Sequence, residues 1–147
     1  MLKMLLKNKE NVIISISMEK EKIKPMQPLV LAMIGDSVQT LFVREFIAKT
    51  YGVKVNKMNK MVSSVVSAGS QFLTFKEIES ELFDDEVDIA RRARNTHIHT
   101  KAKNFSFNEY IHATALEALF GYLYLAGEND RLNHFLEKSL KQLKTDF

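Results

Sequence analysis

Apolar residues recur at helical spacing along most of this chain. From residue 28 onward they return every three or four positions, which is the spacing of one face of an α-helix. In the first such stretch the apolar positions are Leu29, Met33, Ile34, Val38, Leu41, Phe42 and Phe46. Pro28 suits the first turn of a helix, and Tyr51 followed by Gly52 suits its end. The pattern predicts a helix over residues 28–51.

The rest of the chain keeps the same period. Further helical regions are predicted over residues 56–81, 83–95, 107–126 and 129–143. The small, serine-rich segment 63–70 divides the first of these regions into two helices, and acidic residues at 84–86 favour a helix N-terminus there. A polar loop at 96–106 and Gly127 separate the last helices. The predicted fold class is all-α, with a single helical domain.

The first residues lack this pattern. Residues 1–24 contain six Lys, three Glu and one short apolar stretch at 12–16. No h-region of adequate length follows the basic start, so a secretory signal is not indicated. We expect residues 1–25 to form a strand-like or disordered arm and residues 26–147 to form the domain.

Composition narrows the function classes. The chain has 147 residues, is 46% hydrophobic and carries a formal net charge of +3, which fits one globular domain. Five Gly and two Pro are too few for a small β-sandwich or barrel. The absence of Cys excludes a disulfide framework and a thiolate metal site. No apolar run reaches the roughly 18 residues of a membrane span, and a cytoplasmic location is expected.

Two isolated carboxylates stand out in the most apolar helical stretches. Asp36 is the only residue between positions 29 and 43 that is charged at neutral pH, and Glu117 is the only such residue between 113 and 127. A carboxylate in a core helix requires a compensating group. One interpretation is that both face solvent or pair with a neighbouring Arg. The other is that they hold a hard divalent cation such as Mg²⁺, which prefers carboxylate oxygen.

Charge is strongly segregated in one region. Residues 77–88 contain seven acidic residues and no basic one, and residues 91–103 contain five basic residues and no acidic one. This contrast suits either a solvated helix with complementary ends or a basic ridge for RNA phosphates. The candidate RNA-binding residues of the ridge are Arg91, Arg92, Arg94, Asn95, Lys101 and Lys103. Lys57, Lys60 and His112 are further candidates, although an exposed His is the simpler interpretation of His112.

Four motifs in order resemble the ribonuclease III family, in its small Mini-III branch. Residues 34–38 (Ile-Gly-Asp-Ser-Val) resemble the first family motif, and residues 115–125 resemble the second metal-binding helix. Between them, residues 66–71 and residues 91–95, followed by 103–104, are similar to the Mini-III pattern. The resemblance covers about residues 29–136.

The resemblance implies an all-α endoribonuclease domain that forms a homodimer and cleaves double-stranded RNA to 5′ phosphate and 3′ hydroxyl ends. It implies that Asp36 and Glu117 hold catalytic Mg²⁺, for which Mn²⁺ can substitute. It also implies maturation of a large-subunit ribosomal RNA precursor, aided by a large-subunit ribosomal protein. The longer enzymes carry further acidic residues where this chain has Thr114 and Asn56, which leaves the number of metal ions per site open.

Two other functions are compatible with the residues. The first is a non-catalytic RNA-binding or ribosome-assembly module that uses the basic ridge on the same fold. The second is a helical protein-interaction domain in which Asp36 and Glu117 are merely ion-paired. Cleavage of double-stranded RNA that depends on Mg²⁺ separates the enzyme from the first alternative. RNA affinity with a steep salt dependence separates it from the second, which predicts no such affinity.

Overall fold

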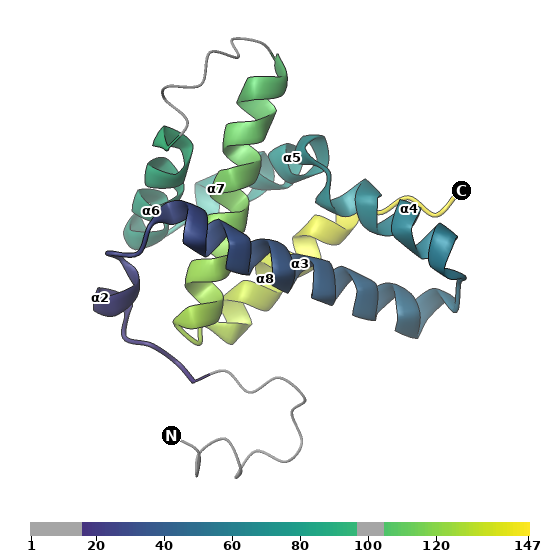
Figure 1. The fold of residues 1–147 in the computed structure, drawn as a ribbon, viewed down its shortest axis with the longest axis horizontal. Coiled ribbons are helices and arrows are strands. Elements are labelled where there is room, and N and C mark those ends of the chain that lie inside the picture. The colour runs from purple at the N-terminus through teal and green to yellow at the C-terminus, as the bar shows by residue number, and fades with distance from the viewer. Residues whose placement is uncertain (1–15, 97–104) are drawn as a thin grey trace.

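The computed structural model describes residues 16–96 and 105–147. This part of the chain is helical and contains no strand, which confirms the all-α prediction. The α-helices are α2 (Lys20–Ile23), α3 (Pro28–Tyr51), α4 (Val55–Val66), α5 (Ala68–Ile78), α6 (Asp84–Asn95), α7 (Phe105–Leu125) and α8 (Asn129–Ser139) (Figure 1). Short 3₁₀ turns follow α5 at Glu79–Glu81 and α8 at Leu140–Gln142.

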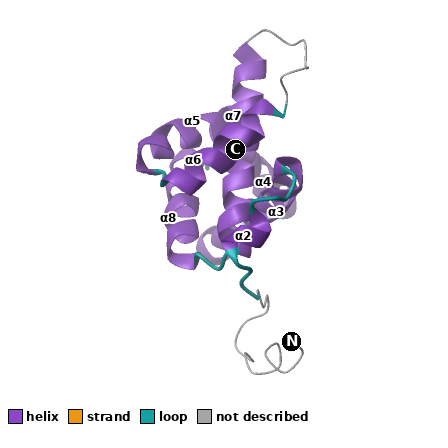
Figure 2. Ribbon diagram, turned by 90° about the vertical axis from the view of Figure 1, so that its left-hand side faces the viewer, coloured by secondary structure: helices purple, strands orange, loops and turns teal. Residues whose placement is uncertain are grey.

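Helix α7 forms the centre of the domain, and α3, α5, α6 and α8 all pack against it. Figure 2 shows α5 and α8 on one side of the molecule and α3 with α4 on the other. The middle of α7 is apolar around most of its circumference and is almost entirely buried. Its buried apolar residues are Ala113, Ala115, Leu116, Ala118, Leu119, Phe120, Tyr122 and Leu123. Within the described ranges, no helix is both long and apolar enough to cross a lipid bilayer.

Helices α3 and α7 touch through their backbones, because glycine occupies the crossing point on each helix. A Cβ atom on Gly35 of α3 would lie 1.7 Å from the Glu117 carbonyl oxygen of α7. A Cβ atom on Gly121 of α7 would lie 2.0 Å from the Leu31 carbonyl oxygen of α3. Only glycine permits this approach. The crossing therefore fixes the residues that flank it on both helices, including Asp36 and Glu117.

Most predicted helix boundaries are confirmed. Helix α3 spans the predicted residues 28–51, and its end at Gly52 adopts a left-handed conformation with φ 57°. The interruption predicted within 63–70 falls at Ser67, which ends α4 and caps α5 by accepting a hydrogen bond from the Ser70 backbone N–H. Helix α7 begins two residues earlier than predicted, at Phe105. The last predicted helix ends at Ser139, and a 3₁₀ turn continues it to Gln142.

The described part of the N-terminal arm is not strand-like. Residues 20–23 form the short helix α2, whose Ile23 is fully buried in the main core. The Met18 backbone N–H donates a hydrogen bond to the Leu125 carbonyl at the end of α7, at 2.8 Å. The strand-like expectation is therefore wrong for this segment, because one buried apolar side chain and backbone contacts attach it to the domain. Residues 1–15 of the predicted arm lie outside the described part.

The acidic segment 77–88 is largely neutralised inside the domain. The carboxylate of Glu86, almost fully buried, binds the Arg131 guanidinium of α8, which also donates to the Glu81 carbonyl at 2.6 Å. Other acidic residues of this segment pair with cations of the arm, of α8 and of the turn after it. These pairs are Glu81 with His134 and Lys138, Glu77 with Lys141, and Asp85 with Lys20. The acidic segment thus attaches α8 to the domain.

The glycine crossing leads to a stability prediction. Gly35→Ala should lower the free energy of unfolding by about 3 kcal/mol or more, because the two helices must separate to admit the methyl group. Urea unfolding followed by circular dichroism measures this loss. Gly69→Ala is the matched control, because its Cβ would lie 3.5 Å from the Glu109 side chain, an ordinary contact. The control should change stability by less than about 1 kcal/mol; equal losses in the two variants would contradict the proposed crossing constraint.

Candidate active site

The structure brings the two isolated carboxylates together. Asp36 lies on α3 beside Gly35, and Glu117 is the residue of α7 whose carbonyl faces that glycine. The Asp36 side chain is exposed and that of Glu117 is half-buried. The two carboxylates are close enough to interact through a hydrogen bond and through their charges. The metal-site hypothesis from the sequence required Asp36 and Glu117 to lie side by side. The crossing of α3 and α7 brings them next to each other.

The surroundings of Glu117 disfavour its charge. Burial is the largest cause, and the neighbouring Asp36 carboxylate adds charge repulsion and a hydrogen bond, so that the pKa of Glu117 rises to about 7. A hydrogen bond from the Gln71 side chain acts in the opposite direction and lowers this pKa. At neutral pH the pair therefore holds a negative charge that the protein compensates only in part.

Within the described part of the chain, no basic side chain is paired with these two carboxylates. Among the described residues, neither Asp36 nor Glu117 forms a salt bridge with Lys, Arg or His. The described residues also contain no group of three His, Cys, Asp or Glu side chains that could form a larger metal cluster. Two adjacent carboxylates without a counter-charge present the hard oxygen ligands that divalent cations such as Mg²⁺ prefer. This donor set fits such an ion, and it does not support the interpretation in which the two residues are ion-paired.

Sequence reasoning assigned no role in this site to two of its residues, although Gln71 lies in the 66–71 motif. Gln71 of α5 and Gln39 of α3 are both almost completely buried, and the Gln71 amide Nε2 donates to the Gln39 carbonyl Oε1 at 2.9 Å. Gln39 lies one helical turn after Gly35, so the pair sits beside the crossing of α3 and α7. The usable signal was a polar residue on the same face of α3 as the buried residues Leu31, Gly35 and Val43.

The candidate RNA-binding residues of α6 differ in how far contacts within the protein already engage their side chains. Arg91 is exposed and pairs with Asp88 at 2.5 Å. The Arg92 guanidinium donates to the Lys24 carbonyl at 2.7 Å and to the Met26 carbonyl at 3.4 Å, so it attaches the arm to α6.

The last two described candidates on α6 lie near its C-terminal end. The Arg94 guanidinium lies 5.7 Å from the centre of the Phe75 ring, and Asn95 is exposed at the last residue of the helix. Lys101 and Lys103 lie outside the described residues, as does the loop that contains His97 and His99.

The remaining candidates occupy two other places. Lys57 and Lys60 lie on α4, and neither forms an ion pair within the described part of the chain. No acidic residue occurs between Glu45 and Glu77, so no carboxylate close in sequence offsets the positive charge of α4.

His112 of α7 is half-buried and is not a free surface residue. Its ring packs against Phe72 and Phe75, and Nδ1 lies 2.7 Å from the Asn108 carbonyl oxygen, to which it donates.

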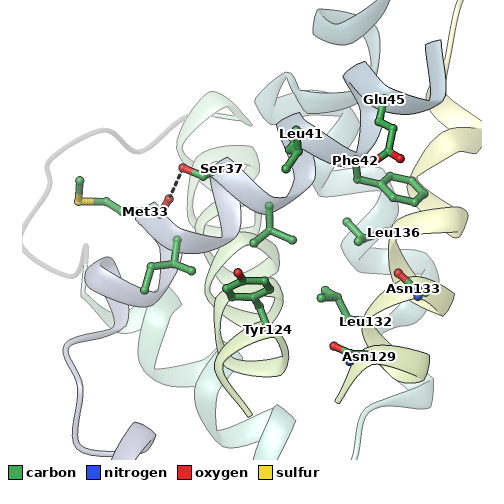
Figure 3. A pocket seen from close by; sticks show the side chains of 12 residues that line it. Met33, Ser37, Leu41, Phe42, Glu45, Tyr124, Asn129, Leu132, Asn133 and Leu136 are labelled. Atoms are coloured by element: carbon green, nitrogen blue, oxygen red, sulfur yellow. Dashed lines mark hydrogen bonds between the residues drawn. The ribbon is translucent and has the colours of Figure 1, made fainter. Parts of the chain in front are cut away.

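A second feature is an apolar pocket of about 610 Å³ between α3, the end of α7 and α8. Figure 3 shows Leu41 and Phe42 of α3, Tyr124 of α7 and Leu132 of α8 around it. Neither Asp36 nor Glu117 lines this pocket. Met33 and Leu41, which line the pocket, are exposed on the surface, and so are Leu29 and Val30 of the same helix.

Comparison with known proteins identifies the fold. Residues 29–128 match the Ribonuclease III domain, which is more than half of the chain. The chain belongs to the ribonuclease III family. It is 40% identical over 119 residues to the Mini-ribonuclease 3 of Clostridium tetani, covering 80% of this chain and 79% of that protein. It is 42% identical over 118 residues to the Mini-ribonuclease 3 of Staphylococcus aureus, covering 79% and 88%.

A solved structure agrees with this assignment. The crystal structure of a Fusobacterium nucleatum protein superposes with a TM-score of 0.71 at 31% identity, covering 80% of this chain and 93% of that one. The predicted resemblance to the Mini-III branch is confirmed, and the chain is an endoribonuclease of the ribonuclease III type. The matched residues include both Asp36 and Glu117.

The raised pKa of Glu117 leads to a prediction for the metal-free protein. Between about pH 4.5 and 7 the folded protein keeps a proton that the unfolded chain has released, so the free energy of unfolding should fall as pH rises through this range. The expected fall is at most about 3 kcal/mol. Urea unfolding in the presence of a chelator, repeated for Glu117→Gln, isolates this contribution. Parallel pH profiles of the two proteins would contradict it.

Proposed function

We propose that this protein is a Mg²⁺-dependent endoribonuclease that cleaves double-stranded RNA, with Asp36 and Glu117 as the residues that hold the ion. The observation that carries the proposal is the proximity of these two carboxylates at the α3–α7 crossing, with no neutralising side chain among the residues that the structure describes. Their oxygen atoms, partial burial and uncompensated charge suit a hard divalent cation, and Mn²⁺ fits the same ligands.

The chain's own residues prepare this site for hydrolysis. A bound divalent ion supplies a water of lowered pKa and a positive charge next to the scissile phosphate. Asp36 and Glu117 provide the anionic oxygens, and the α3–α7 crossing keeps them together. Glu117 must be ionised to bind a cation, and the hydrogen bond from Gln71 favours its ionised form. The proposed products carry 5′ phosphate and 3′ hydroxyl ends.

Double-stranded RNA fits the distribution of positive charge. A-form RNA is recognised mainly through its shape and its phosphates. Arg91, Arg94 and Asn95 near the end of α6, together with Lys57 and Lys60 on α4, are the described side chains that we propose contact the phosphates. Lys101 and Lys103 remain part of this proposal as sequence predictions. Arg92 already donates to a backbone carbonyl of the arm, and the His112 ring packs against aromatic neighbours. We therefore propose that these two residues contribute less to RNA binding than the others.

We propose a homodimer that forms through the apolar face of α3. The same surface carries projecting apolar side chains and the apolar pocket, which is what a self-complementary two-fold interface requires. Met33 is 75% exposed, and an apolar side chain this open on a folded surface next to an apolar pocket is typical of an interaction site.

The natural substrate is proposed from the relatives. We propose maturation of a large-subunit ribosomal RNA precursor in the cytoplasm, aided by a large-subunit ribosomal protein. The similarity to the two Mini-ribonuclease 3 proteins over most of the chain supports this assignment. Incubation with precursor transcripts, compared with an unrelated RNA duplex, tests the choice of substrate.

The catalytic assignment is tested by removing one charge at a time. Asp36→Asn and Glu117→Gln should each reduce cleavage of double-stranded RNA in Mg²⁺ by at least about 100-fold, because each removes an ion ligand. RNA binding measured in a chelator, by gel shift, should stay close to wild type. Asp84→Asn, which changes an exposed carboxylate outside this site, is the control. Wild-type cleavage by Asp36→Asn would refute the site, and binding without any cleavage in the wild type would identify a non-catalytic RNA-binding module.

The dimer is tested with charge on the apolar face. Met33→Glu should shift the protein to a monomer in analytical ultracentrifugation, because a carboxylate would be buried against apolar side chains. Leu73→Glu on α5 is the matched control, since Leu73 is also apolar and is 53% exposed. If both variants remain dimeric, the interface lies elsewhere.

A further inference from the structure

We infer that Gln71 is a positioning residue for Glu117, and that Gln39 sets the direction in which the Gln71 amide points. The inference rests on the proposed function, because it concerns how the catalytic Glu117 is held. It is an addition to the carboxylate pair, since neither glutamine is a candidate ion ligand or an RNA contact in the site described above.

The first step of the argument is the geometry of the Gln71 amide. Its nitrogen carries two hydrogens. One is donated to the Gln39 side-chain oxygen Oε1 at 2.9 Å. The Gln71 side chain is also near enough to the Glu117 carboxylate to lower the pKa of Glu117 by hydrogen bonding. A side-chain amide that donates to one fixed acceptor is restricted in rotation, so the bond to Gln39 keeps the second N–H available to Glu117.

The second step is the position of Gln39. It lies three residues after Asp36 and four after Gly35 on α3, and its side chain is fully buried. The polar chain Gln39–Gln71–Glu117–Asp36 therefore begins and ends on the same helix and passes through α5 and α7. This polar chain links three helices through the Glu117 carboxylate, which must be ionised to bind the proposed ion.

The third step is the free-energy penalty of burying these two glutamines. Within the described part of the chain, the buried Gln39 Nε2 has no hydrogen-bond partner. Burying an unpaired amide is unfavourable, and an apolar side chain at this position would avoid the penalty. The neighbouring core residues Leu31 and Val43 are apolar and fully buried. A polar pair retained in such surroundings is more typical of a functional site than of a packing core.

The experiment compares Gln71→Leu, Gln39→Leu and the double variant. Three quantities are measured: the single-turnover cleavage rate on an RNA duplex, the affinity for Mn²⁺ without RNA by calorimetry, and the free energy of unfolding. Thr74→Val is the matched control, because Thr74 is a buried polar residue of α5 whose hydroxyl has no hydrogen-bond partner among the described residues. Asp36→Asn is included to test the proposed function separately.

Gln71→Leu should lower the cleavage rate and the Mn²⁺ affinity by roughly 10-fold to 100-fold, the range typical of groups that orient a metal ligand. The Kd for RNA should not change. The double variant should show the same loss as Gln71→Leu, because Gln39 acts only through Gln71. It should also be at least as stable as the wild type, because both polar groups are removed together. Thr74→Val should match the wild type in cleavage and Mn²⁺ affinity.

The outcomes separate the two claims. Wild-type cleavage and Mn²⁺ affinity in the double variant, with an inactive Asp36→Asn, would overturn the role of the glutamines and leave the proposed function standing. An active Asp36→Asn would instead overturn the proposed function.

A spectroscopic measurement covers the case in which the Leu variants do not fold. The chain contains four glutamines, so the side-chain amide spectrum of protein labelled with ¹⁵N-glutamine is simple. Gln39 and Gln71 should give the slowly exchanging signals because they are buried. One of these signals should shift in Glu117→Gln, and an unchanged pair would overturn the inference.

Discussion

The backbone contact between α3 and α7 is the constraint on which the site depends. Gly35 faces the Glu117 carbonyl, and Gly121 faces the Leu31 carbonyl, so the two helices are held at a separation that no larger residue allows. The carboxylates of Asp36 and Glu117 flank this contact, one on each helix. Their proximity follows from the packing of the core, because the residues that bring the helices together are the neighbours of the residues proposed to hold the ion.

The same contact explains why the site is electrostatically unusual. Partial burial and the neighbouring Asp36 raise the pKa of Glu117, and no described cation compensates the pair. The other carboxylate buried in the described part of the domain is neutralised, since Glu86 binds Arg131. Among the described residues, charge is therefore left unbalanced at the edge of the core, where a cation is proposed to bind.

Much of this arrangement was predictable from the sequence. Helical periodicity gave the extent of α3, and an isolated acidic residue in each of two apolar helices indicated Asp36 and Glu117. The buried face of α3 marked Gln39, but its hydrogen bond to Gln71 was not predictable, because a bond between residues far apart in the chain has no local pattern. The strand-like prediction for the arm was wrong for a related reason, because Ile23 of α2 is buried by contacts with helices distant in the chain. The hydrogen bond of Arg92 to the Lys24 carbonyl is likewise a contact between distant residues that no local pattern indicates.

The ion pairs of α8 have a consequence for binding thermodynamics. Binding to a polyanion is driven largely by the release of counter-ions, and a cation already paired with a carboxylate releases few of them. Arg131, Lys138 and Lys141 are committed in this way to the acidic segment, whereas Lys57 and Lys60 are not. The salt sensitivity of RNA binding should therefore reflect this smaller set of uncommitted side chains. The net charge of the chain is therefore a poor guide to the salt sensitivity of RNA binding.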